Sequence, residues 1–212
     1  MASVSLRTFV FLDNLQPQLA AFIGTTARGF LPVAGVASMF IETAPGLIIN
    51  RITDVALKET AVTPGIMVVE RAFGLLEFHH ADQGQVRLGG QAVLRHLGLS
   101  ETDRLAPRAV SDQVIRAVEP YHAQLLNRIR YGDMLIAGES LFILETEPAG
   151  YVAYAANEAL KAARVKLIDA SLFGAFGRLY LSGSEAPIDE ARQAALRGLE
   201  SIAGKRSPGH EP

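Results

Sequence analysis

The sequence predicts an α/β protein built from two tandem units that fold in the same way. Three observations predict this class: the chain matches itself at an offset of 103 residues, short apolar runs alternate with amphipathic stretches, and 49% of its 212 residues are hydrophobic. This composition supplies enough apolar side chains for a packed core. A period of about 100 residues is too long for a solenoid or propeller unit, so each copy is expected to be a domain of its own.

The internal repeat holds one register over most of the chain, which chance does not preserve, and we interpret it as a tandem duplication. It predicts a first domain over 1–104 and a second over 105–204. The last residues, 205–212, are polar and contain proline and glycine, so a disordered tail is expected there. The matched segments are Glu42-Thr43 with Glu145-Thr146, Ala56-Leu57-Lys58 with Ala159-Leu160-Lys161, Ala72-Phe73-Gly74 with Ala175-Phe176-Gly177 and, after a slip of one residue, Gln91-Ala92 with Gln193-Ala194.

Hydrophobic periodicity predicts the elements of the first copy. A strand, Leu6–Leu12, and a helical turn, Pro17–Thr26, come first, and isoleucines recur on one stripe of the predicted helix Gly46–Ala61. A glycine-containing loop, Glu70–Gly74, joins two paired strands. The remaining strands are expected over Met39–Thr43, Ile66–Val69 and Leu75–His79, and the last helix over Gln85–Leu97.

The second copy is expected to repeat this order. Its helix Gly150–Ala163 is rich in alanine, which favours helix formation, and the loop Ser171–Gly177 joins two paired strands. Each copy therefore forms an antiparallel sheet covered by helices on one side. The remaining elements are strands over Arg108–Val118, Leu141–Thr146, Lys166–Ala170 and Arg178–Ser182, a helical turn over Tyr121–Asn127 and a helix over Ile188–Ala203.

Charge, cysteine content and hydropathy exclude several classes of protein. The formal net charge is −2, so the chain offers no basic field for a nucleic-acid backbone. It contains no cysteine, which excludes disulfides, thiolate zinc sites and a cysteine nucleophile. No stretch reaches the roughly 18 apolar residues that a membrane span needs, and the N-terminus lacks a signal-peptide pattern. We therefore expect a cytoplasmic protein with neither nucleic-acid nor membrane partners.

Enzyme signatures are missing from the sequence. It has no P-loop, GxGxxG, GxSxG or HExxH motif. His79 and His80 are neighbours at a strand end, where side chains point to opposite faces, so they are expected to be solvated rather than to share a metal. Asp82, Asp103, Asp112 and Asp189 fall in turns or at helix starts and are interpreted as caps. The sequence predicts no catalytic residue, no metal site and no cofactor.

The two hairpin loops differ in an informative way. The first reads Glu70-Arg71-Ala72-Phe73-Gly74, whereas the second reads Phe173-Gly174-Ala175-Phe176-Gly177. The shared Ala-Phe-Gly is expected to fix the loop conformation, and the first two positions change from a charged pair to Phe-Gly. Either the charged pair is an ordinary solvated tip, or the tips meet around a symmetry axis. The residues alone leave both alternatives open.

Four stretches resemble a known family: Glu70–Glu77 (ERAFGLLE), Pro45–Lys58 (PGLIINRITDVALK), Glu145–Ala153 (ETEPAGYVA) and Gly174–Glu185 (GAFGRLYLSGSE). They are similar to tandem-domain shell proteins of bacterial microcompartments, and within these to the carboxysome branch, the α-carboxysome tandem shell protein and its β-carboxysome counterpart. The resemblance covers the chain from about Leu6 to Gly204. It implies two circularly permuted, ferredoxin-like microcompartment domains (an α+β sandwich) and a structural role in the carboxysome shell.

The resemblance also implies a quaternary structure and a gate. Three chains would form a trimer that mimics a hexamer, and two trimers would stack face to face. Glu70 and Arg71 would gate a central pore, with Ala72, Phe73 and Gly74 in the same loop and Phe173 and Gly174 in the alternate loop. Gly74 and Gly174 would supply backbone freedom for the movement. Phosphorylated sugar metabolites, ribulose bisphosphate and phosphoglycerate, would pass through the pore.

A second implied site is the edge where hexagonal tiles meet hexameric shell proteins. The family places a lysine there, within an Asp/Asn-x-x-x-Lys pattern that matches Asp54 to Lys58 and Asn157 to Lys161. Such a spacing puts both members on one helix face, so each is otherwise an ordinary exposed pair. Lys58 and Lys161 are two of only four lysines and lie at the repeat offset, which favours the edge role.

One other class of function is compatible with the residues. Duplicated small α/β domains also occur in trimeric cytosolic regulators that bind a small anion between subunits. Microscopy of concentrated protein distinguishes the two, because shell proteins form tiled sheets or stacked discs whereas a regulator gives isolated particles.

Overall fold

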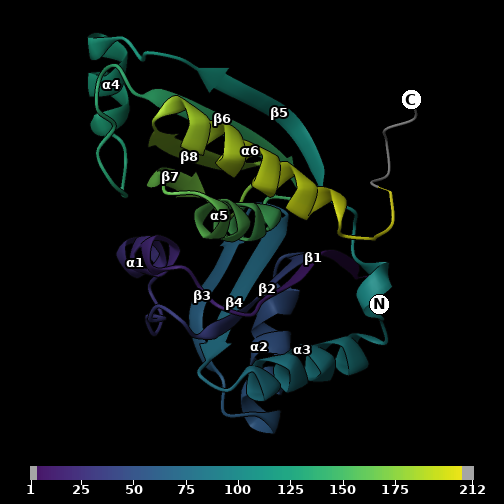
Figure 1. The fold of residues 1–212 in the computed structure, drawn as a ribbon. Helices are drawn as coiled ribbons and strands as arrows, with labels where there is room; N and C mark the ends of the chain where they lie inside the picture. The colour runs from purple at the N-terminus through teal and green to yellow at the C-terminus, as the bar shows by residue number, and fades with distance from the viewer. Residues whose placement is uncertain (1–3, 207–212) are drawn as a thin grey trace.

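The computed structural model describes residues 4–206 and contains two four-stranded antiparallel sheets, each with helices packed on it (Figure 1). One sheet is built from the first copy and the other from the second. The predicted α/β class, the two tandem units and the antiparallel pairing are therefore confirmed.

The first domain has its strands in the order β1-β2-β4-β3. Its hairpin is tighter than expected, because Glu70 pairs with Phe73 and only Arg71 and Ala72 remain at the tip. The elements are β1 (Ser5–Leu12), α1 (Pro17–Thr26), β2 (Ala37–Ala44), α2 (Ile48–Glu59), β3 (Thr63–Glu70), β4 (Phe73–His80) and α3 (Gln83–Leu97).

The second domain repeats the arrangement, with its strands in the order β5-β6-β8-β7. A short 3₁₀ helix, Glu101–Asp103, precedes it. Its elements are β5 (Arg108–Ile115), α4 (Pro120–Asn127), β6 (Ser140–Glu147), α5 (Tyr151–Ala162), β7 (Lys166–Ser171), β8 (Gly177–Gly183) and α6 (Glu185–Glu200).

The two sheets share their register as well as their order. β1 pairs with β2 and β5 with β6 through a bulge at the same place, between Leu6 and Thr8 in one and between Ala109 and Ser111 in the other. Every residue from β1 to the start of β4 therefore has a structural counterpart 103 positions later, which we call its twin.

The first sheet is covered on both faces, rather than on the one face that the sequence predicts. Phe9, Met39 and Ile41 point toward α2 and α3 and belong to one core. Val10 and Phe40, which alternate with them, belong instead to a core that contains α5 of the second domain. Helix α5 thus lies between the two sheets, with α1 beside it (Figure 1).

Lys205, which the sequence analysis assigns to a disordered tail over 205–212, is held in place by its own hydrogen bonds. Lys205 donates its backbone N–H to the Arg104 carbonyl at 2.7 Å, and its ammonium pairs with Asp103 at 2.7 Å. The carbonyl of Lys205 accepts the Ala106 N–H at 2.8 Å, which ties the chain end to the linker between the domains. The rest of the predicted tail, 207–212, lies outside the described residues.

Candidate functional site

The Glu70-Arg71 pair lies at the tip of the β3–β4 hairpin. Arg71 takes a positive φ of 53°, and its side chain is 92% exposed. The Arg71 Nε lies 3.9 Å from the Glu70 Oε1, an ion pair that is too long for a hydrogen bond. An exposed, loosely held pair of this kind gains little energy from one geometry, so Arg71 is free to change partners.

The structure brings the two predicted loops together within one chain. A Cβ atom at Gly174 would lie 2.6 Å from the Glu70 Oε2, so the second loop approaches the Glu70 carboxylate closely. Gly174 also has a φ of +109°, which favours glycine. Phe173, beside it, is 40% exposed. The Glu70 carboxylate therefore faces the second loop instead of lying on an isolated tip.

The remaining residues of the first loop are anchored. The Phe73 ring stacks under the Arg7 guanidinium, whose carbon lies 3.6 Å from the ring centroid. Gly74 does not supply the backbone freedom expected of it, since it lies within β4. Its lack of a side chain is needed for packing, because a Cβ there would clash with the Gly46 carbonyl oxygen.

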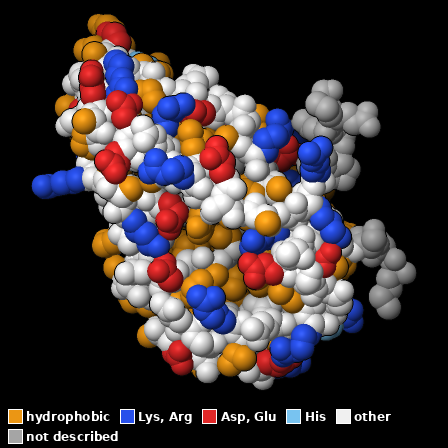
Figure 2. Space-filling model, turned by 45° about the vertical axis from the view of Figure 1, so that its right-hand side comes forward, with side chains coloured by type: hydrophobic (Ala, Val, Ile, Leu, Met, Phe, Trp, Pro, Cys, Tyr) orange, Lys and Arg blue, Asp and Glu red, His pale blue; other side chains and the backbone are white. Residues whose placement is uncertain are grey.

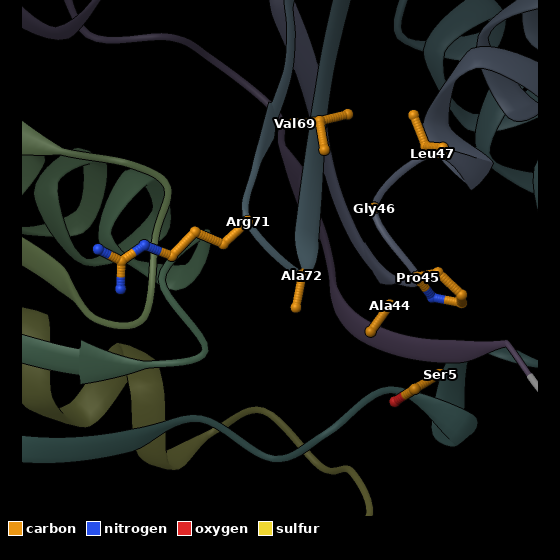
Figure 3. Close-up of a pocket in the computed structure, with 8 residues that line it drawn as sticks. All are labelled: Ser5, Ala44, Pro45, Gly46, Leu47, Val69, Arg71 and Ala72. Carbon is orange, nitrogen blue, oxygen red and sulfur yellow. The ribbon is translucent and has the colours of Figure 1, made fainter.

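An open hollow lies between this hairpin tip and the N-terminus of α2 (Figure 3). Its surface is mainly apolar, and Arg71 extends away from the other lining side chains. The lining residues are Ser5, Ala44, Pro45, Gly46, Leu47, Val69, Arg71 and Ala72.

The two predicted edge pairs have different surroundings. Lys58 bonds Asp54 at 2.6 Å, and both side chains are exposed on α2. Asn157 is buried instead: its amide donates to the Asn14 carbonyl at 3.1 Å and accepts the Gln16 N–H at 2.9 Å. The second pair therefore lies where α5 meets the first domain.

Lys161 joins the same boundary between the domains. Its ammonium bonds Asp13 of the first domain at 2.6 Å and Glu158 at 3.1 Å. The hydrogen bond from Lys161 lowers the pKa of the Asp13 carboxyl below its ordinary value. Lys161 keeps about a third of its side chain exposed, so it contacts the first domain and still reaches the surface.

Sequence reasoning missed a buried carboxylate at the centre of the domain boundary. Glu42 is 1% exposed. Its Oε1 accepts Arg7 Nε at 2.9 Å, and its Oε2 accepts the Thr8 hydroxyl and the backbone N–H of Gly150, both at 3.0 Å. The signal in the sequence is a charged residue directly after the apolar run Met39–Ile41.

A second buried polar cluster was also missed. His79, expected to be solvated, is buried, and its Nδ1 lies 3.2 Å from Glu77 Oε1, which also accepts the Ser38 hydroxyl at 2.6 Å.

No group of three or more potential metal-ligating side chains occurs within residues 4–206. Likewise, none of the helices described for this chain is long and apolar enough to cross a membrane.

Comparison with known proteins places the chain in one family. A family model described as the CsoS1D N-terminal domain matches residues 6–103. The carboxysome shell protein CcmP of Synechococcus elongatus is 52% identical over 206 residues, which cover 97% of each chain. The solved double-ringed trimeric shell protein of the RMM microcompartment is 37% identical, with a TM-score of 0.93 over 96% of this chain and 100% of that one.

A second solved structure carries the same fold. The fused permuted hexameric shell protein of the RMM microcompartment is 46% identical to this chain, with a TM-score of 0.92 over 95% of this chain and 100% of that one. The predicted permuted tandem microcompartment fold is thereby confirmed. The chain belongs to the family of carboxysome shell proteins that includes CcmP and CsoS1D.

Proposed function

We propose that the chain forms a trimeric, pseudohexagonal tile of the carboxysome shell, with a central pore gated by Glu70 and Arg71. A structural role in the shell follows from the family. The trimer rests on one observation: residues that are buried where the two domains meet have twins that are exposed. We therefore expect the contact between the two domains of one chain to be repeated between the second domain of one chain and the first domain of the next.

One side of the proposed contact between chains lies on α4. Phe22 on α1 packs against α5 and is 2% exposed, whereas its twin Leu125 is 60% exposed. Tyr121, one turn earlier, is also exposed. We call Tyr121 and Leu125 the α4 patch. An exposed apolar side chain whose twin is buried, as Leu125 is, indicates a surface that a partner covers.

The complementary half lies on the first domain. Leu172 is 3% exposed in the core between the domains, whereas its twin Val69 on β3 is 39% exposed. Met67 is exposed on the same strand, and Leu47 is 72% exposed, although its twin Gly150 is buried. We call Leu47, Met67 and Val69 the α2 patch. On the face drawn in Figure 2, hydrophobic side chains gather in a hollow ringed by charged ones.

Each chain thus carries two unlike, complementary faces, which is the condition for a head-to-tail ring. If the contact between chains repeats the contact within the chain, six similar domains from three chains close the ring. The trimeric and hexameric shell proteins among the solved relatives support this closure, and the double-ringed relative supports stacking of two such trimers.

In such a ring, three Glu70-Arg71 tips and three Phe173-Gly174 loops alternate around the axis. Arginines a few ångströms apart repel by about 1–4 kcal/mol per pair, and pairing each with a Glu70 carboxylate relieves this repulsion and closes the pore. Outward rotation of Arg71 opens it. The planar guanidinium also matches phosphate oxygens, which suits ribulose bisphosphate and phosphoglycerate as the metabolites in transit.

The gate is tested by replacing Arg71 with alanine. Three Glu70 carboxylates then face one another without counter-charges, so we expect an open pore in every crystal, with or without phosphoglycerate. Crystal structures of the Arg71→Ala and wild-type trimers check this. Arg95→Ala, which removes an exposed arginine paired with Glu59 at 2.6 Å, serves as the control. A closed pore in Arg71→Ala crystals would show that Arg71 is not the gate.

The tile edge is tested by reversing a single charge. Lys58→Glu is the simpler variant because, among the described residues, Lys58 forms an ion pair only with Asp54 on its own helix, whereas Lys161 also bonds Asp13 of the first domain. We expect Lys58→Glu trimers to remain intact but to lose tiled sheets in negative-stain micrographs. Lys205→Glu is the matched control, since Lys205 is an exposed lysine paired with Asp103. Unchanged sheets would remove Lys58 from the edge.

A further inference from the structure

The buried Glu42 caps a helix of the other domain. Its Oε2 accepts the N–H of Gly150, the residue just before α5, at 3.0 Å, while Arg7 Nε holds Oε1 at 2.9 Å. A carboxylate at a helix N-terminus satisfies an unpaired backbone donor and complements the helix dipole. The side chains of Thr8 and Leu75 close the space around Gly150.

The twins of Glu42 and Gly150 are Glu145 and Leu47, and these two residues do not bond each other within the chain. Glu145, the twin of Glu42, accepts Arg178 Nε at 2.7 Å on Oε1, and its Oε2 makes no hydrogen bond with any described residue. Leu47, the twin of Gly150, precedes α2, and its N–H likewise finds no acceptor within residues 4–206. Within the described part of the chain, Glu145 thus offers a free acceptor and Leu47 a free donor at positions that match Glu42 and Gly150.

The arginine at this second site is not a copy of the first. Arg7 lies on β1 and has Val110 as its twin, whereas Arg178 lies on β8 and is the twin of Leu75. Both nevertheless hold Oε1 of their glutamate through Nε. Two arginines from different strands thus orient two glutamates in the same way, and in the first case Oε2 is the oxygen that caps the helix.

We propose that Glu145 caps α2 of the next subunit by accepting its Leu47 N–H. The hollow of Figure 3, which includes Gly46 and Leu47, is the seat of this contact, because the equivalent space at Gly150 is filled from the first domain. The occupant is a second copy of this chain, presenting Glu145 and Arg178. This inference rests on the proposed trimer. It adds one hydrogen bond between subunits, from Leu47 to Glu145, which orients the α4 patch of one chain on the α2 patch of the next.

The bond is tested by the trimer dissociation constant of Glu145→Ala, measured by analytical ultracentrifugation over a dilution series. A hydrogen bond to a charged group is worth about 1.5–3 kcal/mol, so we expect each subunit contact to weaken about tenfold or more. Glu147→Ala is the matched control, because Glu147 on the same strand pairs with Arg108 of its own chain at 2.8 Å. Melting curves of Glu145→Ala and Glu147→Ala show whether the two variant subunits are folded to the same extent.

Hydrogen exchange reports on the donor itself. In the wild-type trimer we expect the Leu47 amide to exchange slowly, and in Glu145→Ala trimers at high concentration to exchange faster. If the wild type is a trimer, and Glu145→Ala changes neither its dissociation constant nor the exchange rate of the Leu47 amide, the proposed cap is wrong. The proposed trimer is not affected by that result. A monomeric wild type overturns both proposals. If Glu145→Ala does not fold, Leu47→Pro removes the same bond from the donor side, since Leu47 has a φ of −62° that proline accepts. Leu47→Ala is its control, because it takes the same apolar side chain from the α2 patch and keeps the N–H, so the cap requires Leu47→Pro to weaken the trimer more than Leu47→Ala does.

Discussion

Replacing Glu42 with leucine is expected to lower the free energy of unfolding by about 3–5 kcal/mol. The change leaves the Arg7 guanidinium buried without its carboxylate and removes the acceptor of the Gly150 N–H. One Arg7 nitrogen, Nη2, already lacks a partner among the described residues, so the guanidinium has no second acceptor to replace Glu42. Urea unfolding followed by circular dichroism, at one protein concentration for all variants, measures the loss.

Two further variants separate the causes of this loss. Glu147→Leu breaks the half-exposed pair with Arg108 and is expected to cost about 0–1 kcal/mol, so it is the control for removing a glutamate from a strand. Arg7→Met combined with Glu42→Leu removes both charges and is expected to recover most of the stability. A Glu42→Leu protein as stable as Glu147→Leu would contradict the role assigned to the buried network.

Leu125→Asp is expected to convert the trimer into a monomer at micromolar concentration. Leucine burial contributes about 1.5–3 kcal/mol per contact, and a trimer has three such contacts. Aspartate adds the cost of burying an unpaired charge. Size-exclusion chromatography with light scattering gives the mass. Leu88→Asp on α3 is the control, because Leu88 is 49% exposed and its repeat counterpart, Glu190, is a solvated charge.

The complementary variant is Met67→Asp, which damages the α2 patch and is expected to give monomers as well. Each variant retains one intact face: Leu125→Asp keeps the α2 patch, and Met67→Asp keeps the α4 patch. A mixture of the two is therefore expected to form a one-to-one dimer that cannot close into a ring. Homodimers of either variant, or trimers of Leu125→Asp, would contradict the head-to-tail contact.

The elements of the fold could be predicted from the sequence because their signals are local. Prolines end the apolar runs of β2 and β6, and the repeat lets each copy support the other. The family likewise follows from stretches such as Pro45–Lys58, whose order of strand, turn and helix is specific. The hairpin tip was predicted too long because strand pairing continues to Glu70 and Phe73, which no turn signal marks.

The polar groups at the domain boundary could not be predicted in the same way. Asn157 looks like the twin of Asp54 in an exposed helix pattern, and only the approach of the first domain makes it a buried bridge to Asn14. His79 looks like a strand end, yet it is buried beside Glu77, whose carboxylate also accepts the hydroxyl of the distant Ser38. These environments depend on segments tens to more than a hundred residues away, which periodicity does not report.

Helix α5 between the two sheets has a consequence for how this chain can be divided. Because α5 of the second domain covers the second face of the first sheet, the two domains are not independent modules joined by a flexible linker. A cut in the linker after Leu97 would release a first half with an uncovered apolar sheet and a second half whose helix α5 keeps α6 and its own sheet but loses the first sheet. The fused polypeptide thereby fixes a one-to-one ratio of the two unlike halves at synthesis, and no separate control of their amounts is needed.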